Sequence, residues 1–348
     1  MLFRYKIKPV SPIMTSLMSD SLFGHFCWAV RYEKGEAYLE EFLLSYKTGV
    51  QPPVLFSSAV LSGYLPRPVL PPPKRRQMTD FVEKYFIRDP EGLFSGLTDK
   101  KRRFEGMNRI KEWSRCQLIP INAWQTLKAG YSDYKLQEIF YDQFKNYPSM
   151  NLAVSEEEIT ASNTINRISG SVLEDGGGLY SKEKIWFFPG VELDLYVETA
   201  EEETADLAKW FLESYLPVAG FGKDKSVGMG VLSIAEDTAF NPNDFKVDNP
   251  NACMALSLTA FDGMENYRGF YRLKTKFGKL GGDFAISSPT GGYPRPFKKP
   301  ILMMEPGSVF FASEQINRQC LTGNVHSDAR IRHCGLPVTI PLNIMEDE

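Results

Sequence analysis

The sequence contains few of the residues that metal centres, disulfide frameworks and membrane spans require. Three histidines occur in 348 residues, and the five cysteines form no C-x-x-C pair. Structural zinc sites are built from closely spaced cysteines and histidines, and disulfide frameworks from an even number of cysteines in a small secreted chain. No stretch approaches the ~18 uninterrupted apolar residues of a membrane helix. We therefore expect a cytoplasmic protein with no metal, no cofactor and no membrane contact.

Net charge is also low, at −3 from 40 basic and 43 acidic residues. This balance argues against a solitary, promiscuous nucleic-acid binder, whose surface is strongly basic. The charges are nevertheless uneven. Acids gather at 156–158, 198–203 and 346–348, whereas residues 268–299 contain eight basic residues and one acid, a local charge of +7. A local basic surface of this kind fits a subunit that holds RNA inside a larger assembly.

The hydrophobic pattern predicts an α+β fold. Strict alternation, as in Leu2-Phe3-Arg4-Tyr5-Lys6-Ile7-Lys8, indicates a half-buried strand and differs from the continuous apolar core of a signal peptide. Together the elements follow the order strand, helix, strand, strand, helix, strand of a ferredoxin-like domain, which RNA-recognition domains share. The expected elements are strands at 2–8, 54–56, 191–197 and 231–234 and helices at 19–30 and 201–216.

Two ferredoxin-like, or RRM-like, domains are expected. The segment 236–251, rich in Asn, Asp and Pro, is the linker candidate between a domain at 1–240 and a degenerate second domain at 250–348. The first domain contains a charged helical insertion at about 74–150 and a protruding β-hairpin at about 159–188. The glycines at 176–178 mark the hairpin tip.

Residues 220–230, Gly-Phe-Gly-Lys-Asp-Lys-Ser-Val-Gly-Met-Gly, form the most distinctive motif. A dinucleotide fingerprint needs a third glycine where Lys225 stands, and it follows a strand rather than a helix. No register supplies a Walker A motif. Two interpretations remain open: a loop whose amides and lysines bind phosphate or RNA, and a tight helix-to-strand connection that needs small residues.

The pattern G-h-G-x-x-x-x-x-G-h-G, with h hydrophobic and basic residues inside, resembles the signature loop of the RAMP superfamily of CRISPR-associated proteins. Further segments resemble the type III-A, or Csm-complex, branch that binds the crRNA 5′ handle. The similarity extends over nearly the whole chain. These segments are Ser16–His25, Asn163–Arg167, Leu179–Ser181 and Gly335–Val338.

This resemblance implies a non-catalytic RNA-binding subunit. Its two ferredoxin-like domains would hold the 5′ handle, and its hairpin would act as a thumb near the handle–guide junction, close to target RNA. Its protein partners would be the large polymerase-like subunit and a RAMP backbone subunit. The residues that the resemblance assigns to RNA are Gly220, Phe221, Gly222, Lys223, Lys225, Ser226, Gly228 and Gly230 in the loop, Asn166 and Arg167 in the thumb, and Ser19 and His25 in the N-terminal segment.

A second RNA-binding candidate comes from the basic run itself. Arg272, Lys274 and Lys276 recur at period two, so one face of a strand presents all three cations. Aromatic residues are interleaved, and cations with exposed rings are the usual means of binding single-stranded RNA. Lys298 and Lys299 belong to the same candidate surface. The alternative is an ordinary solvated strand face.

His25 also raises an enzymatic alternative, a metal-independent crRNA-processing endoribonuclease with this histidine as general acid or base. Packing within a helix is the simpler role for it. We interpret Asp20 as a helix N-cap and His326 and His333 as surface histidines. A third possibility is a scaffold subunit that makes no RNA contact.

Overall fold

The computed structural model shows a mixed α+β chain. The residues that it describes are 1–47, 50–89, 91–144, 153–165, 168–172, 178–261, 268–285, 296–311 and 321–345.

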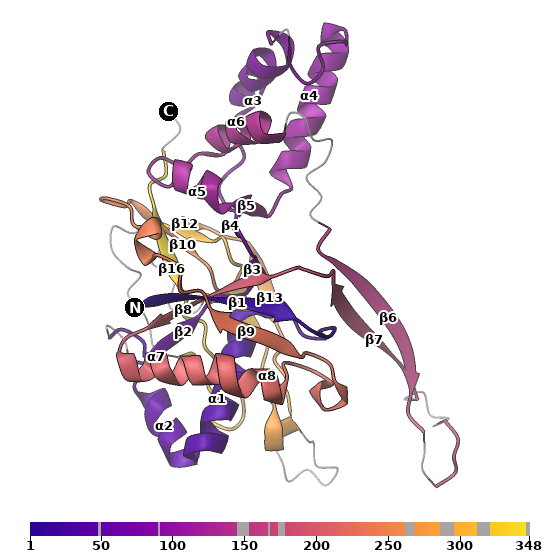
Figure 1. Cartoon of the computed structure of the whole chain (residues 1–348), viewed down its shortest axis with the longest axis vertical. Helices are drawn as coiled ribbons and strands as arrows, with labels where there is room; N and C mark the ends of the chain where they lie inside the picture. The colour runs from indigo at the N-terminus through magenta and orange to yellow at the C-terminus, as the bar shows by residue number, and fades with distance from the viewer. Residues whose placement is uncertain are drawn as a thin grey trace.

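An antiparallel sheet forms the centre of the N-terminal part (Figure 1). Its strands are β2 (Val54–Phe56), β8 (Leu193–Thr199), β1 (Leu2–Pro9) and β9 (Leu232–Glu236), in that spatial order, and β3 (Val60–Leu61) also pairs with β8. In the predicted βαββαβ unit these are the second, third, first and fourth strands, respectively. The N-terminal part therefore has the expected ferredoxin-like strand arrangement.

The strand β8 differs from its prediction, because all seven of its residues are buried rather than every second one. Helices that pack on the sheet cover one of its faces. On the other face, Phe240 and Phe245 of the predicted linker pack on Tyr196, with ring centroids 5.7 and 5.4 Å apart. Asp194 is buried because Lys6 binds it at 2.6 Å.

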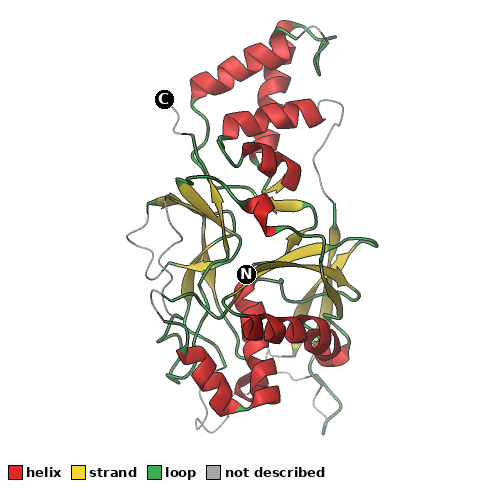
Figure 2. Ribbon diagram, turned by 60° about the vertical axis from the view of Figure 1, so that its left-hand side comes forward, coloured by secondary structure: helices red, strands yellow, loops and turns green. Residues whose placement is uncertain are grey.

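Helices cover one face of this sheet (Figure 2). They are α1 (Ser19–Lys34), α7 (Glu202–Lys209), the π-helical η2 (Trp210–Tyr215) and α8 (Leu216–Ala219), and α2 (Glu36–Leu44) packs on α1. The helix predicted at 201–216 continues without a break through η2 and Pro217 to Ala219. Pro217 directly follows the π-helical stretch, at the start of α8.

Aromatic packing joins the helices to the sheet. The ring of Phe26 on α1 lies 5.5 Å from Phe56 of β2 and 5.4 Å from Phe211 of η2. The N-cap prediction for Asp20 is wrong, because Met18 holds that position and Asp20 lies inside the first turn. There its carboxylate is still favoured by the helix dipole.

The predicted helical insertion is a separate lobe at one end of the molecule (Figure 1). Its helices are α3 (Arg75–Val82), η1 (Glu83–Ile87), α4 (Asp99–Ser114), α5 (Ile121–Leu127) and α6 (Asp133–Phe144).

The lobe has its own aromatic core. Phe86, Trp113 and Phe140 are buried, and the backbone of Gly106 is so close to Phe86 that a Cβ there would meet its ring at 2.8 Å. The short strands β4 (Tyr64–Pro66) and β5 (Leu118–Pro120) pair where the lobe joins the rest of the chain. This packing fixes the direction in which α4 extends.

The predicted hairpin is present as β6 (Ser155–Asn163) and β7 (Leu179–Phe187), paired along nine residues each. It projects from the body of the protein (Figure 1). The thumb residues Asn166 and Arg167 and most of the glycine tip lie outside the described residues.

The C-terminal part is built from two small antiparallel sheets, and its described residues contain only the short 3₁₀ turn η5 (Gly282–Ala285) and no α-helix. A second ferredoxin-like domain and the domain boundaries therefore stay predictions. A 3₁₀ turn, η4 (Pro242–Phe245), precedes this part. The strands are β12 (Gly269–Phe270), β15 (Val309–Phe310), β10 (Ala252–Ala255) and β16 (Thr339–Leu342) in one sheet, and β11 (Thr259–Ala260), β14 (Ile301–Met304) and β13 (Leu273–Lys276) in the other.

None of the helices in the described part of the chain combines the length and the apolar character needed to cross a membrane.

Candidate RNA-binding site

The glycine-rich loop at 220–230 connects α8 to β9 and is closed at its neck. The amide of Phe221 donates to the carbonyl of Gly230 at 2.8 Å, and the amide of Gly230 donates to Pro12 at 2.9 Å. A Cβ at position 230 would overlap the carbonyl of Phe221, and the φ of Gly230 is +69°. Only glycine fits both the space and this backbone conformation. The neck therefore explains part of the motif on structural grounds.

The segment at 10–16, between β1 and α1, forms hydrogen bonds with the loop. Thr15 Oγ1 accepts a hydrogen bond from the amide of Lys223 at 3.1 Å, and Ser11 Oγ accepts one from Val231 at 2.9 Å. A Cβ on Gly222 would approach Thr15 to 2.7 Å. Sequence reasoning missed Ser11 and Thr15, because no spacing rule connects them to a loop about two hundred positions away.

His25 holds the loop from the helix side. Its Nε2 accepts a hydrogen bond from the amide of Gly222 at 3.1 Å, and its ring lies 4.7 Å from that of Phe221. Burial, with a smaller contribution from Lys225, lowers the pKa of His25 to about 4. The imidazole is therefore neutral near pH 7, and the nitrogen that a general base would use is occupied. A positioning role fits this geometry better than direct RNA contact or catalysis.

The tip of the loop, residues 223–228, is the part open to solvent. It contains η3 (Lys225–Val227), and Lys223, Lys225 and Ser226 are exposed. Most loop amides already have acceptors within the chain. The structure gives none to the amides of residues 224–226, all of which it describes. Gly220, Phe221 and Gly230 are buried, so they shape the loop, and the exposed tip is what a ligand can reach.

The hairpin meets this loop along β7. Lys182 of β7 forms an ion pair with Asp224, and Ile185 exchanges both backbone hydrogen bonds with Ile13. The loop, the 10–16 segment and β7 of the hairpin thus lie against one another. Lys182 was not predicted from the sequence, where it is one of several charges on an exposed strand.

The predicted basic strand is partly neutralised by the fold. Arg272 lies 3.4 Å from Glu305, and Lys276 binds Asp20 at 3.1 Å. These acids lie outside the basic run in the sequence, so the excess of positive charge there is not an excess in space. Lys274 is exposed, and the structure gives it no ion pair within the described residues.

The two final lysines of the basic run behave differently. Lys298 donates to the carbonyl of Arg332 at 2.9 Å, and burial lowers its pKa. Its ammonium group thus points inward, and the prediction that it contacts RNA is not supported. Lys299 is exposed and donates to Asn324 at 3.0 Å.

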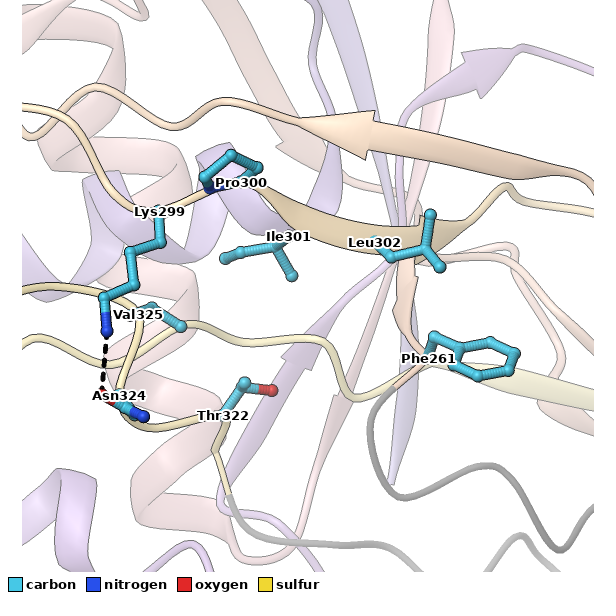
Figure 3. A pocket seen from close by; sticks show the side chains of 8 residues that line it. All are labelled: Phe261, Lys299, Pro300, Ile301, Leu302, Thr322, Asn324 and Val325. Carbon is cyan, nitrogen blue, oxygen red and sulfur yellow. Dashed lines mark hydrogen bonds between the residues drawn. The ribbon is translucent and has the colours of Figure 1, made fainter.

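Lys299 lies at the rim of a cavity of about 370 Å³ (Figure 3). Lys299, Asn324 and Thr322 line one side of it, and Phe261 and Leu302 line the other.

Three further predictions need correction. Ser19 is 5% exposed, and its Oγ accepts a hydrogen bond from the amide of Leu258 at 3.0 Å. It therefore joins α1 to the C-terminal part and is not available to RNA. His326 and His333 are buried rather than at the surface. Burial and the Lys298 ammonium lower the pKa of His333 to about 3.

The described residues contain no cluster of three or more metal-ligating side chains.

No family model matches this chain, and no curated protein matches it in sequence. Solved structures match it in fold. One is a chain of the "Csm3-Csm4 subcomplex in the type III-A CRISPR-Cas interference complex", with 16% identity and a TM-score of 0.56, covering 98% of this chain and 99% of that one. Another is a chain of the "Csm1-Csm4 cassette in complex with cA4", with 13% identity, a TM-score of 0.52 and full coverage of both chains.

Csm4 is the subunit named in both structures. The chain therefore shares its fold, over its full length, with a chain of each of these two Csm structures. This finding agrees with the resemblance carried by the glycine loop and the N-terminal segment. At these levels of identity the likeness is one of fold.

Proposed function

We propose that this protein is a non-catalytic, RNA-binding subunit of a type III-A CRISPR interference complex and that it holds the 5′ handle of the crRNA. The observation that carries the proposal is the loop tip at 223–228, where exposed lysines, and amides without an acceptor among the described residues, lie beside strand β7 of a projecting hairpin. The full-length fold match to structures containing Csm4 supports it.

The chemistry of the tip suits a phosphate group. Asp224 has φ +58° and precedes the short helical turn η3, a backbone conformation in which successive amides converge on an anion. Lys223 and Lys225 add charge-assisted hydrogen bonds, and Ser226 adds a hydroxyl donor. The carboxylate of Asp224 would oppose a phosphate, but Lys182 already neutralises it.

The hairpin suits a position beside paired or splayed RNA. It carries exposed apolar side chains, among them Ile159 at 71% and Leu179 at 75% exposure. Aromatic Tyr180 and Trp186 are also exposed and offer surfaces on which bases stack. We infer that this hairpin lies near the handle–guide junction, where target RNA pairing begins. The large polymerase-like subunit and a RAMP backbone subunit are the protein partners, and the cytoplasm is the compartment.

The endoribonuclease alternative depends on His25. Its pKa is lowered to about 4, so the imidazole is almost entirely neutral near pH 7. The lone pair on Nε2 already accepts the hydrogen bond from the amide of Gly222. The geometry favours the non-catalytic role.

Co-purification tests the proposal. The full-length protein is expressed with the products of its neighbouring genes, and the bound RNA is sequenced. Recovery of crRNA with a common 5′ end is expected. Absence of RNA from an assembled complex would contradict it and favour the scaffold role. Specific cleavage of repeat RNA by the purified protein, lost in His25→Ala, would favour the enzyme.

A further inference from the structure

One face of α4 in the helical lobe carries cations to which the structure gives no ion pair within the described residues. The positions follow i, i+4, i+8, i+11 and i+15, which fall within one narrow strip of a helix. The strip contains no acidic residue and spans about 22 Å at ~1.5 Å per residue. We call it the α4 strip, and its residues are Lys100, Phe104, Asn108, Lys111 and Arg115.

The other arginines of α4 behave differently. Arg102 donates to the carbonyls of Ile87, Ser95 and Leu97. Arg103 binds Glu83 at 2.8 Å. These side chains tie the lobe together. By contrast, Lys100, Lys111 and Arg115 are exposed and make no ion pair within the described ranges.

Arg109 also differs from the residues of the strip, because it forms an ion pair within α4. Arg109 lies 2.8 Å from Glu112, one turn further along α4. The three arginines at 102, 103 and 109 are thus paired within the lobe, whereas the cations of the strip have no ion pair within the described residues.

An exposed aromatic ring lies in the middle of this strip. Phe104 is 65% exposed, one turn after Lys100. The lobe does not need it for packing, because the opposite face of α4 supplies the core contacts through Gly106, Ile110 and Trp113. An exposed ring between uncompensated cations is the combination with which proteins hold single-stranded nucleic acid: phosphates meet the cations and a base stacks on the ring.

We propose that the α4 strip is a second RNA-binding surface, which contacts single-stranded RNA through its phosphates and one stacked base. It lies in the lobe, away from the glycine loop that follows α8 (Figure 1). The proposal goes beyond handle binding, since it assigns RNA contact to the insertion. A protein-docking face fits less well, because interface cores are depleted in charged residues, especially lysine, and the strip has one apolar side chain among cations.

Binding of the purified full-length protein to a fluorescent 20-nucleotide uridine RNA, measured across a salt series, tests the strip. Loss of two phosphate contacts in Lys100→Gln/Lys111→Gln is expected to reduce the slope of log K against log salt by about 1.4. The matched control is Lys34→Gln/Lys47→Gln, which removes the same charge from two exposed lysines elsewhere. The control is expected to keep the wild-type slope. Equal slopes for the strip and control variants would overturn the proposal.

The ring is tested separately. Phe104→Ala is expected to weaken binding of the uridine RNA about fivefold or more with no change in the salt slope, because it removes stacking and no charge. The side chain is exposed, so circular dichroism should show an unchanged fold. Wild-type affinity in this variant would contradict the stacked base. Because uridine RNA has no handle sequence, this result is independent of whether the glycine loop binds the handle.

The source of the RNA is resolved in the reconstituted complex. A photo-reactive phenylalanine analogue at position 104 is irradiated with either the crRNA or the target RNA labelled. A crosslink to either strand supports the proposal and identifies the strand. A crosslink to protein subunits alone would overturn it.

Discussion

The glycine loop and the basic strand are both candidates for RNA binding, and the fold treats them in opposite ways. The loop contains only two lysines, but both lie at an exposed tip beside amides that have no acceptor among the described residues. The strand belongs to a run with a charge of +7, yet Glu305 and Asp20 approach two of its cations. Charge counted along the sequence is therefore a weaker guide than charge left unpaired in space.

The largest expected effect is the destabilisation of the glycine loop by Gly230→Ala. The added methyl group overlaps the carbonyl of Phe221, and φ is +69°. We expect a loss of at least about 2 kcal/mol in the free energy of unfolding, measured in urea. Gly228→Ala is the matched control, because its φ is also positive but its Cβ meets no atom within 4 Å. Equal losses in both variants would contradict the close neck.

Lys276→Met tests whether the Lys276 cation of β13 stabilises the fold through Asp20. Its removal leaves the nearly buried carboxylate of Asp20 without its cation, so we expect a loss of about 1–3 kcal/mol in the free energy of unfolding. Lys274→Met removes an exposed lysine from the same strand, and a change below about 0.5 kcal/mol is expected. A larger loss at 274 than at 276 would reverse the assignment.

The contact of His25 with the glycine loop predicts that the stability of the protein depends on pH. His25 has a pKa of about 4 in the folded protein against ~6.5 when unfolded. The unfolded chain thus binds the proton more readily, and stability falls as pH decreases through 6.5 and levels off below about 4. Lowering the pH from 7 to 5 should therefore reduce the free energy of unfolding by about 1–2 kcal/mol through this residue.

The variant His25→Gln isolates this contribution. Its amide oxygen is able to accept the Gly222 hydrogen bond, and it does not titrate. Urea unfolding at pH 7 and 5 should therefore show a smaller loss than in the wild type. His333 titrates in the same range in both proteins, so the difference between them reports on His25. An identical loss in both would contradict its buried, neutral state.

The smallest effect concerns the contact between hairpin and loop. Lys182→Gln leaves the carboxylate of Asp224 facing the ligand, so RNA binding should weaken about two- to threefold. The double variant Lys182→Gln/Asp224→Asn should regain most of that affinity, which a filter-binding cycle measures. Additive losses in the double variant would indicate that the ion pair has no part in RNA binding.

The fold was predictable where the pattern is local. The alternation at 2–8 and the helical spacing after residue 19 correspond to β1 and α1, and the hairpin follows from two polar arms around glycines. The burial of β8 was not predictable, because Phe240 and Phe245, which cover it, come from a segment that resembles a linker. Residue type favours Asp20 over Met18 as an N-cap, so the local signal indicated the wrong position for the start of α1.

Of the candidate site, only the central loop could be proposed from the sequence. Lys223, Lys225 and Ser226 were identified from the motif, but Thr15 and Lys182 reach the loop from distant segments. Long-range pairing of this kind leaves no periodic signal. The same limit explains the basic strand, whose neutralising acids are remote in sequence.

Binding of crRNA handle RNA to two charge-matched variants tests the central claim most directly. Lys223→Gln/Lys225→Gln removes the exposed loop cations, and Arg272→Gln/Lys276→Gln removes the paired strand cations. Our account predicts that the loop variant reduces the salt slope by about 1.4 and weakens binding about tenfold or more, while the strand variant stays near wild type. Wild-type binding by the loop variant, with loss in the strand variant, would contradict it.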